Sequence, residues 1–179
     1  MSILLSLLGT FFVTNFDFAE PPSEPKDPIT FGGKKFVHRF SKGDLHEYTP
    51  TDQKVLKRFK DMLTINVYPK SKSGEDLAGN ANSVLETYKA HGAVVVSTNS
   101  VPRTEDRPAE HLVVVLFPRP DFIEASFARF KLQDGKGVSI VYSHRIYDKK
   151  AGDAMNQWLK ANGQAKEKAL MSLKFAIPK

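Results

Sequence analysis

Apolar and polar residues alternate along three stretches of the chain, which is the pattern expected of half-buried β-strands. The first stretch covers residues 63–68, and the other two cover residues 122–133 and 138–147. The last two flank Asp134 and Gly135, a dipeptide that favours tight turns. We therefore expect the second and third stretches to pair as a long antiparallel hairpin.

A shorter hairpin is indicated at residues 36–48, whose two halves flank Lys42 and Gly43. In its simplest register one face carries Phe36, His38, Phe40, Leu45 and Glu47. Two later stretches, residues 93–98 and 111–117, are almost continuously apolar and rich in valine. Such runs are typical of strands buried on both faces, so we expect both to be central strands.

The clearest helical pattern precedes these two strands. Apolar residues recur at helical spacing over residues 77–88. Ser73 and Asp76 have the spacing of a capping box, and Gly92 stands where a helix commonly ends. Two more helical stretches, separated by Gly163, close the chain. We expect all of these helices to lie on the sheet.

The order of elements, with mostly short connections, predicts an α+β fold with a mainly antiparallel sheet flanked by helices. The order seen along residues 62–96, 129–147 and 151–171 resembles the PsbP-like superfamily. The resemblance covers roughly residues 35–173 and is carried by element order, without a diagnostic motif. It implies an αβα sandwich and a non-catalytic binding or accessory role, and it supplies no functional residue.

The N-terminal region has the features of an exported protein. Residues 3–13 form an apolar run that is shorter than the roughly 20 residues needed to cross a bilayer. We expect residues 1–19 to be a signal peptide cleaved after Ala19, although a buried strand or helix is the alternative. Residues 20–28 contain four prolines and predict a linker, followed by a single domain over residues 29–179. The processed protein would then be periplasmic or secreted, and not integral to a membrane.

Charge and composition narrow the chemistry further. The chain has 26 Lys and Arg residues against 20 Asp and Glu residues, a formal charge of +6, which permits anionic partners. It has no cysteine, which excludes disulfides, thiol catalysis and zinc-thiolate sites. The cations do not cluster in blocks, and export would separate the protein from nucleic acid, so we expect no nucleic-acid partner.

The polar loop between the two apolar runs is the best candidate for ligand binding, because long loops in compact domains are often functional. Arg103 and Arg107 lie in this loop, and Arg119 follows the second apolar run. If these guanidinium groups met at one end of the sheet, they would suit a planar anion. Glu105 and Asp106 would neutralise part of their charge, so a self-paired surface loop is the alternative.

The sequence lacks a nucleophile elbow, a phosphate-binding loop and paired histidines at metal-ligand spacing, so we expect no catalytic residue, metal or cofactor. These observations favour an exported, non-catalytic binding or accessory module whose partner is a protein or an anionic ligand. Two alternatives remain open. One is an enzyme with a dispersed site made of His38, Glu47 and His144, and the other is a structural protein of the cell envelope.

Overall fold

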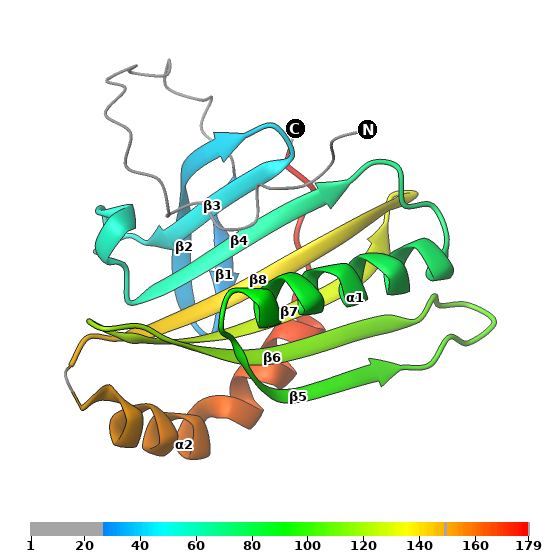
Figure 1. The fold of residues 1–179 in the computed structure, drawn as a ribbon. Helices are drawn as coiled ribbons and strands as arrows, with labels where there is room; N and C mark the ends of the chain where they lie inside the picture. Colours follow the sequence, from blue (N-terminus) through cyan, green and yellow to red (C-terminus); the bar gives the residue numbers. More distant parts are fainter. Residues whose placement is uncertain (1–26, 149, 179) are drawn as a thin grey trace.

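The computed structural model describes residues 27–148 and 150–178 (Figure 1). Within these residues the chain forms eight strands, two α-helices and one short 3-10 helix. The strands are β1 (Ile29–Phe31), β2 (Lys34–Lys42), β3 (Leu45–Pro50), β4 (Asp61–Tyr68), β5 (Val94–Val101), β6 (Glu110–Pro118), β7 (Ile123–Gln133) and β8 (Lys136–Ile146). The helices are η1 (Leu56–Arg58), α1 (Gly74–Ala90) and α2 (Ala151–Ser172).

All eight strands belong to one antiparallel sheet with the order β1-β2-β3-β4-β8-β7-β6-β5. Strands β1 to β4 form one meander and β5 to β8 form another. The two meanders join where β4 pairs with β8, over a register that runs from Asp61 opposite His144 to Tyr68 opposite Gly137. The two meanders are therefore held together by β4 and β8, two strands that are far apart in the sequence.

The expected αβα sandwich is wrong. The sheet curls into a half-barrel, and each helix covers only part of one face (Figure 1). Helix α1 contacts β6 and β7, whereas α2 contacts β7 and β8 from the opposite face. Irregularities between His38 and Phe40, and between Val95 and Ser97, contribute to the curl because bulges increase local twist. Sequence patterning reports which faces are buried, but it does not report this curvature.

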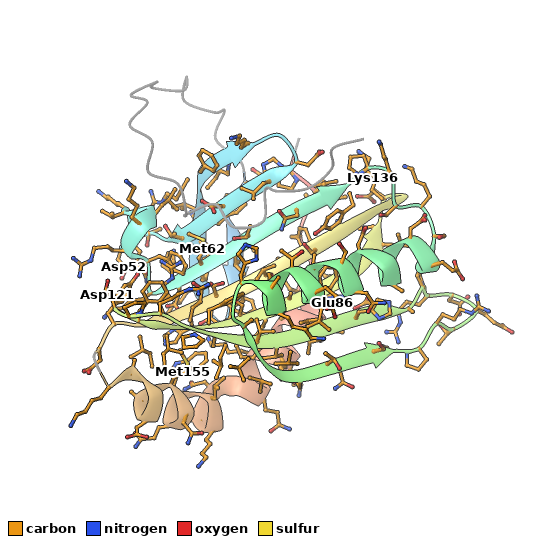
Figure 2. The ribbon with its side chains drawn as sticks, viewed as in Figure 1. Asp52, Met62, Glu86, Asp121, Lys136 and Met155 are labelled. Carbon is orange, nitrogen blue, oxygen red and sulfur yellow. The ribbon has the colours of Figure 1, made fainter. Side chains whose placement is uncertain are left out.

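Two apolar clusters fill the two faces. The larger one lies on the α2 face, where Met155 is fully buried and points from the helix towards the sheet (Figure 2). Apolar side chains from both meanders contribute to it, so it stabilises their junction. The smaller cluster lies under α1 and is built from the helical stripe Leu77, Ala81, Val84 and Tyr88.

The ends of α1 match the sequence prediction. The Ser73 hydroxyl accepts a hydrogen bond from the Asp76 amide, and the Asp76 carboxylate accepts from the Ser73 amide. Gly92 follows the C-cap with a φ of +78°, a conformation that costs glycine little. The expectation of two helices at the end of the chain is wrong, because α2 continues through Gly163. That glycine is buried beside Leu159, where packing offsets its poor helix propensity.

The first hairpin forms as expected, but its register differs. The bulge after His38 places Phe36 and His38 on the α2 face, while Phe40 pairs with Glu47 on the other face. The position of the first apolar run, residues 93–98, also differs from the expectation. It forms β5 at the edge of the sheet and not a central strand. The second apolar run forms the internal strand β6, as expected.

The expected signal peptide and most of the proline-rich linker lie outside the described residues. Among the described helices, neither α1 nor α2 combines the length and apolar character that a membrane crossing requires.

Candidate functional site

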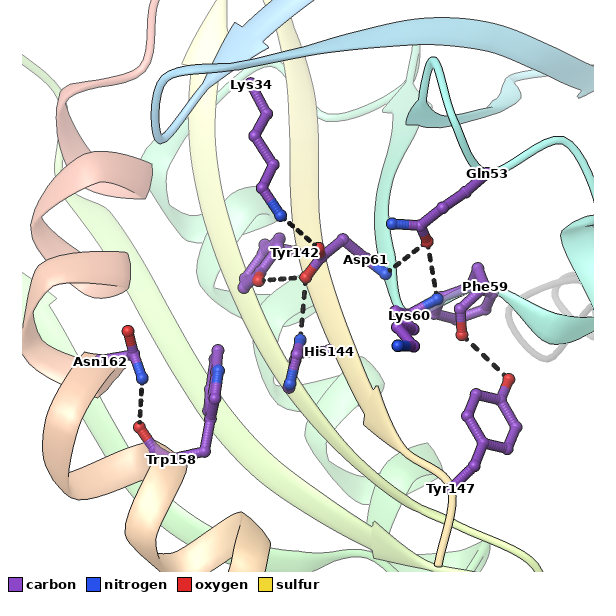
Figure 3. A network of polar contacts seen from close by, with 10 residues as sticks. All are labelled: Lys34, Gln53, Phe59, Lys60, Asp61, Tyr142, His144, Tyr147, Trp158 and Asn162. Carbon is purple, nitrogen blue, oxygen red and sulfur yellow. Dashed lines mark hydrogen bonds and ion pairs between the residues drawn. The ribbon is translucent and has the colours of Figure 1, made fainter.

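A network of polar side chains gathers around Asp61, at the start of β4 (Figure 3). The Asp61 Oδ1 atom accepts hydrogen bonds from the Tyr142 hydroxyl at 2.7 Å and from His144 Nδ1 at 2.8 Å. The Oδ2 atom accepts from Lys34 Nζ at 3.0 Å. Because β4 and β8 pair with Asp61 opposite His144, the sheet itself brings the carboxylate and the imidazole together.

The segment that leads into β4 is tied down by its own contacts. The Gln53 side-chain oxygen accepts hydrogen bonds from the amides of Lys60, at 2.7 Å, and Asp61, at 3.0 Å. The Tyr147 hydroxyl donates to the Phe59 carbonyl at 2.9 Å. These bonds restrict the backbone at Asp61 and therefore hold its carboxylate in place (Figure 3).

The environment keeps Asp61 ionised. Burial alone would raise the pKa of this carboxyl group, but the hydrogen bonds from His144, Tyr142 and Lys34 outweigh burial and hold its pKa well below the usual range. The pKa of Tyr142 is raised, first by burial and then by the negative charge of Asp61. Tyr142 therefore remains a neutral hydrogen-bond donor to the carboxylate.

The imidazole of His144 is oriented on two sides. Its Nδ1 atom faces Asp61, and its ring stacks on the indole of Trp158 from α2, with centroids 4.0 Å apart and planes 6° from parallel. Its Nε2 atom makes no hydrogen bond to any residue that the structure describes, and the side chain is 15% exposed. With Nδ1 directed at Asp61, Nε2 is the ring nitrogen that faces a ligand group.

The pair formed by Asp61 and His144 supports only limited chemistry. No serine or threonine hydroxyl within the described part of the chain hydrogen-bonds to His144, so a nucleophilic triad is not assembled there. Among the same residues, no group of three His, Cys, Asp or Glu side chains can hold a metal ion. The network can bind or orient one polar group, and its other contacts stabilise the junction between the two meanders.

The three arginines expected to bind an anion are not brought together. Arg103 and Arg107 are exposed in the loop that follows β5, where a backbone turn links Thr104 and Arg107. Arg119 follows the other end of β6, so the length of that strand separates it from the loop. Its guanidinium group donates to the His91 carbonyl at 3.2 Å and lies over a phenylalanine ring.

The dispersed site of His38, Glu47 and His144 does not converge either. His38 and His144 lie on the α2 face of the sheet, whereas Glu47 pairs with Thr64 on the opposite face. Burial raises the pKa of Glu47, Arg145 opposes this effect, and Glu124 adds to it. Glu47 therefore belongs to a separate polar group on the α1 face.

Sequence reasoning identified His144 but missed Asp61, Tyr142 and Trp158. Their proximity depends on the β4–β8 pairing and on the position of α2 over that pair. Local patterning shows neither relationship. The local signal for this site is a carboxylate at the first position of a strand in which apolar and polar residues alternate.

A protein-family model matches residues 23–175, which is most of the chain. The chain therefore belongs to the family that this model represents. Among solved structures, the fold is similar to that of Mog1p, the Ran-binding protein of Saccharomyces cerevisiae, with a TM-score of 0.54. The sequences are 12% identical, and the similarity covers 86% of this chain and 95% of that chain. A mutant of protein Mog1 matches with the same TM-score and identity, over 87% of this chain and 96% of that chain.

No curated protein sequence matches the chain. The expected membership of the PsbP-like superfamily is wrong, since the matching family model and the similar Mog1 structures give no support for it. That expectation depended on the order of elements alone, and the same order of strands and helices is compatible with a curled sheet as well as with a sandwich.

Proposed function

We propose that the chain is an exported, non-catalytic module that binds another protein. The observation that carries this proposal is an exposed apolar run on β5, the last of the described strands of the sheet. Val94, Val95 and Val96 at the start of β5 are 57%, 38% and 49% exposed. Contiguous exposed apolar residues on a folded domain commonly mark a protein contact.

The fold supports the same proposal. The similar structure Mog1p is described as a Ran-binding protein, so a sheet of this kind can serve as a protein-binding scaffold. With 12% identity the similarity does not extend to the identity of the partner. A formal charge of +6 favours a partner that is net acidic.

The arginine loop fits this proposal as an auxiliary contact. Arg103 and Arg107 follow directly after β5 in the chain, so a partner seated on β5 would pass close to their guanidinium groups. We assign them a role in attracting acidic groups of the partner. Arg119 lies at the other end of β6, and its anion-binding role remains a separate prediction.

Export is part of the proposal and has its own test. We propose that residues 1–19 are removed as a signal peptide and that residues 20–28 connect the new N-terminus to the domain that begins at Ile29. Intact-mass measurement after expression in a secreting host should show a chain that begins at Glu20. Retention of Met1 would contradict processing and would favour the alternative of a structural protein held at the cell envelope.

Binding is tested by isolating the tagged chain from cells that produce it naturally, after mild chemical crosslinking. We expect one protein to be recovered in fixed stoichiometry, as measured by native mass spectrometry. The matched variants Val95→Lys and Val55→Lys each add one charge at an exposed valine, since Val55 is 62% exposed near η1. Loss of the complex only in Val95→Lys supports binding at β5, whereas recovery of a free monomer contradicts a binding function.

A catalytic function is the second candidate, favoured by the oriented imidazole of His144, whose Nε2 atom has no hydrogen-bond partner among the described residues. Under the binding proposal, His144→Gln leaves the crosslinked complex intact. If the purified chain instead converts a substrate in a metabolite panel, and His144→Gln abolishes that conversion, the catalytic candidate replaces the binding proposal.

A further inference from the structure

Among the described residues, no strand pairs with the outer edge of β5. The strand pairs with β6 on one side and is the last strand of the sheet on the other. Free edges of this kind display a row of N–H and C=O groups that can pair with another strand. Native proteins usually protect such edges with lysine, proline or an inward charge, but residues 94–101 read VVVSTNSV and contain none of these.

The regular part of this edge is its second half. The register shift between Val95 and Ser97 disturbs pairing at the valine run, whereas Ser97 to Val101 pair with β6 without interruption. Main-chain pairing with a further strand is therefore confined to this half. The exposed valines provide apolar surface immediately beside it.

A groove lies along this half of β5 on each face of the sheet. On the α1 face, a groove of about 250 Å³ is lined by Thr98 and Ser100 from β5 and by Asn82 and Leu85 from α1. On the α2 face, a groove of about 590 Å³ lies between β5 and the end of α2. Its lining includes Val101, Leu112, Lys168 and Met171. An added strand points successive side chains to opposite faces, so alternate residues would meet the two grooves.

A buried histidine nitrogen adds a second observation at the groove on the α1 face. His111 lines this groove and faces Ser100 across the strand pair, with its Nδ1 atom 2.9 Å from the Ser100 hydroxyl. Its Nε2 atom is buried and has no hydrogen-bond partner in the described part of the chain. This end of the groove is therefore polar, which suits a hydroxyl or amide group of a ligand.

We propose that the edge of β5 from Ser97 to Val101 binds an extended peptide segment of a partner protein as an additional strand, and this inference rests on the proposed binding function. Main-chain hydrogen bonds hold the segment, and its alternate side chains enter the two grooves. The side chain that faces His111 is a hydroxyl or amide residue. The side chains on the other face are apolar where they meet Leu112 and Met171.

The occupant is a segment of another protein and not a second copy of this chain. Two copies of a chain with a formal charge of +6 repel each other. A partner segment with acidic residues next to its apolar ones avoids this repulsion. A concentration-dependent dimer of the full chain in analytical ultracentrifugation, lost in Thr98→Lys, would overturn this choice of occupant.

The probe is a display library of random linear peptides, selected on the full chain. Thr98 is exposed on β5, whereas Thr51 is exposed in the loop after β3, so Thr98→Lys and Thr51→Lys form a matched pair. We expect selected peptides, made synthetically, to bind the wild type and Thr51→Lys equally. Fluorescence anisotropy should show at least tenfold weaker binding to Thr98→Lys. Hydrogen exchange should show that the bound peptide protects the amides of β5.

Backbone methylation of the selected peptide separates strand addition from other binding modes. An added strand uses the N–H groups of every second residue, so methylation of one alternate set should abolish binding while methylation of the other set is tolerated. Equal effects of the two sets, equal binding to the two Thr variants, or a selection that yields no peptide would each overturn strand addition. If the crosslinked cellular partner binds both Thr variants equally, the binding function stands and only its location on β5 fails.

Discussion

Arg129 on β7 and Glu110 on β6 form a two-pronged ion pair, with Nε 2.8 Å from Oε2 and Nη2 3.0 Å from Oε1. The remaining Arg129 nitrogen, Nη1, donates to the carbonyls of Leu170 and Leu173 at 2.9 Å and 3.0 Å. These carbonyls lie at the end of α2, where the regular helical hydrogen bonds run out, and the Leu170 carbonyl also accepts from the Leu173 amide at 3.2 Å. One buried guanidinium group therefore joins two strands and caps a helix.

Replacement of Arg129 should destabilise the protein strongly. In Arg129→Met the Glu110 carboxylate remains without its partner, so we expect the free energy of unfolding to fall by about 3–5 kcal/mol. Arg129→Lys keeps the charge but cannot form both bonds to Glu110 and should also destabilise. Urea unfolding measures both effects, with the exposed Arg103→Met as control. A loss in Arg129→Met no larger than that of the control would show that the ion pair adds nothing to stability.

The carboxylate of Asp61 should contribute stability that depends on pH. The fold lowers its pKa, so its contribution is present above the unfolded value of about 4 and is lost as the pH falls through the lower folded pKa. At neutral pH we expect Asp61→Asn to lower the free energy of unfolding by about 3 kcal/mol, because three donors lose a charged acceptor. Unfolding measured as a function of pH should show the gap between wild type and variant narrowing below about pH 4. An unchanged gap in strong acid would contradict this role, and the exposed Asp52→Asn serves as control.

Glu47 should behave in the opposite sense. Burial raises its pKa, so its contribution to stability is complete below the unfolded value of about 4.3 and is lost as the pH rises through the folded pKa. Glu47→Gln should therefore be more stable than the wild type at neutral pH and equal to it in acid. Thermal unfolding at several pH values gives the comparison, with the loop variant Glu105→Gln as control. A variant that is less stable at neutral pH would show that the attraction of Glu47 to Arg145 outweighs its burial.

Gly137 is required by a close approach between β8 and the start of the loop before α1. A Cβ atom at Gly137 would lie 2.7 Å from the Ser71 Cβ atom, and the Gly137 amide donates to the Ser71 carbonyl at 2.9 Å. We expect Gly137→Ala to destabilise by about 1–3 kcal/mol, the usual cost of overpacking. The double variant with Ser71→Gly removes the contact and should recover part of this loss in urea unfolding. A double variant whose losses simply add would show that the clash is not the cause.

The capping box of α1 offers a smaller test. Ser73→Ala removes the hydroxyl that accepts from the Asp76 amide, so we expect a loss of about 1 kcal/mol in the free energy of unfolding. Ser83→Ala replaces an exposed serine within the same helix and serves as the matched control. Equal stability of the two variants would mean that the cap does not contribute.

Local sequence signals predicted the elements of the fold more successfully than their arrangement. Three sequence signals report short-range conformations, and all three are confirmed. They are the cap at Ser73, the glycine that follows α1 (Gly92) and the turn at Asp134 and Gly135. The composition of the valine run predicts a buried strand at the centre of the sheet. Its edge position depends on the pairing of β4 with β8, which leaves β5 at the far end of the sheet.

The candidate sites were harder to predict for the same reason. The network around Asp61 requires contacts between residues such as Asp61 and Tyr142, which are 81 positions apart. Arg103 and Arg119 lie beyond opposite ends of β6, a separation that the sequence alone does not show. Residues at the two ends of one strand are close in sequence and distant in space, whereas paired strands reverse this relationship.

The junction between the two meanders also sets the order in which a ribosome can complete the fold. Tyr68 and Ser139 hydrogen-bond across this junction, yet they are 71 residues apart in the sequence. At synthesis rates of about 5–20 residues per second, β4 waits for several seconds before β8 emerges to pair with it. During that interval the nascent first meander presents an open strand edge. Until β8 is made, β4 is therefore open to pairing with a wrong strand.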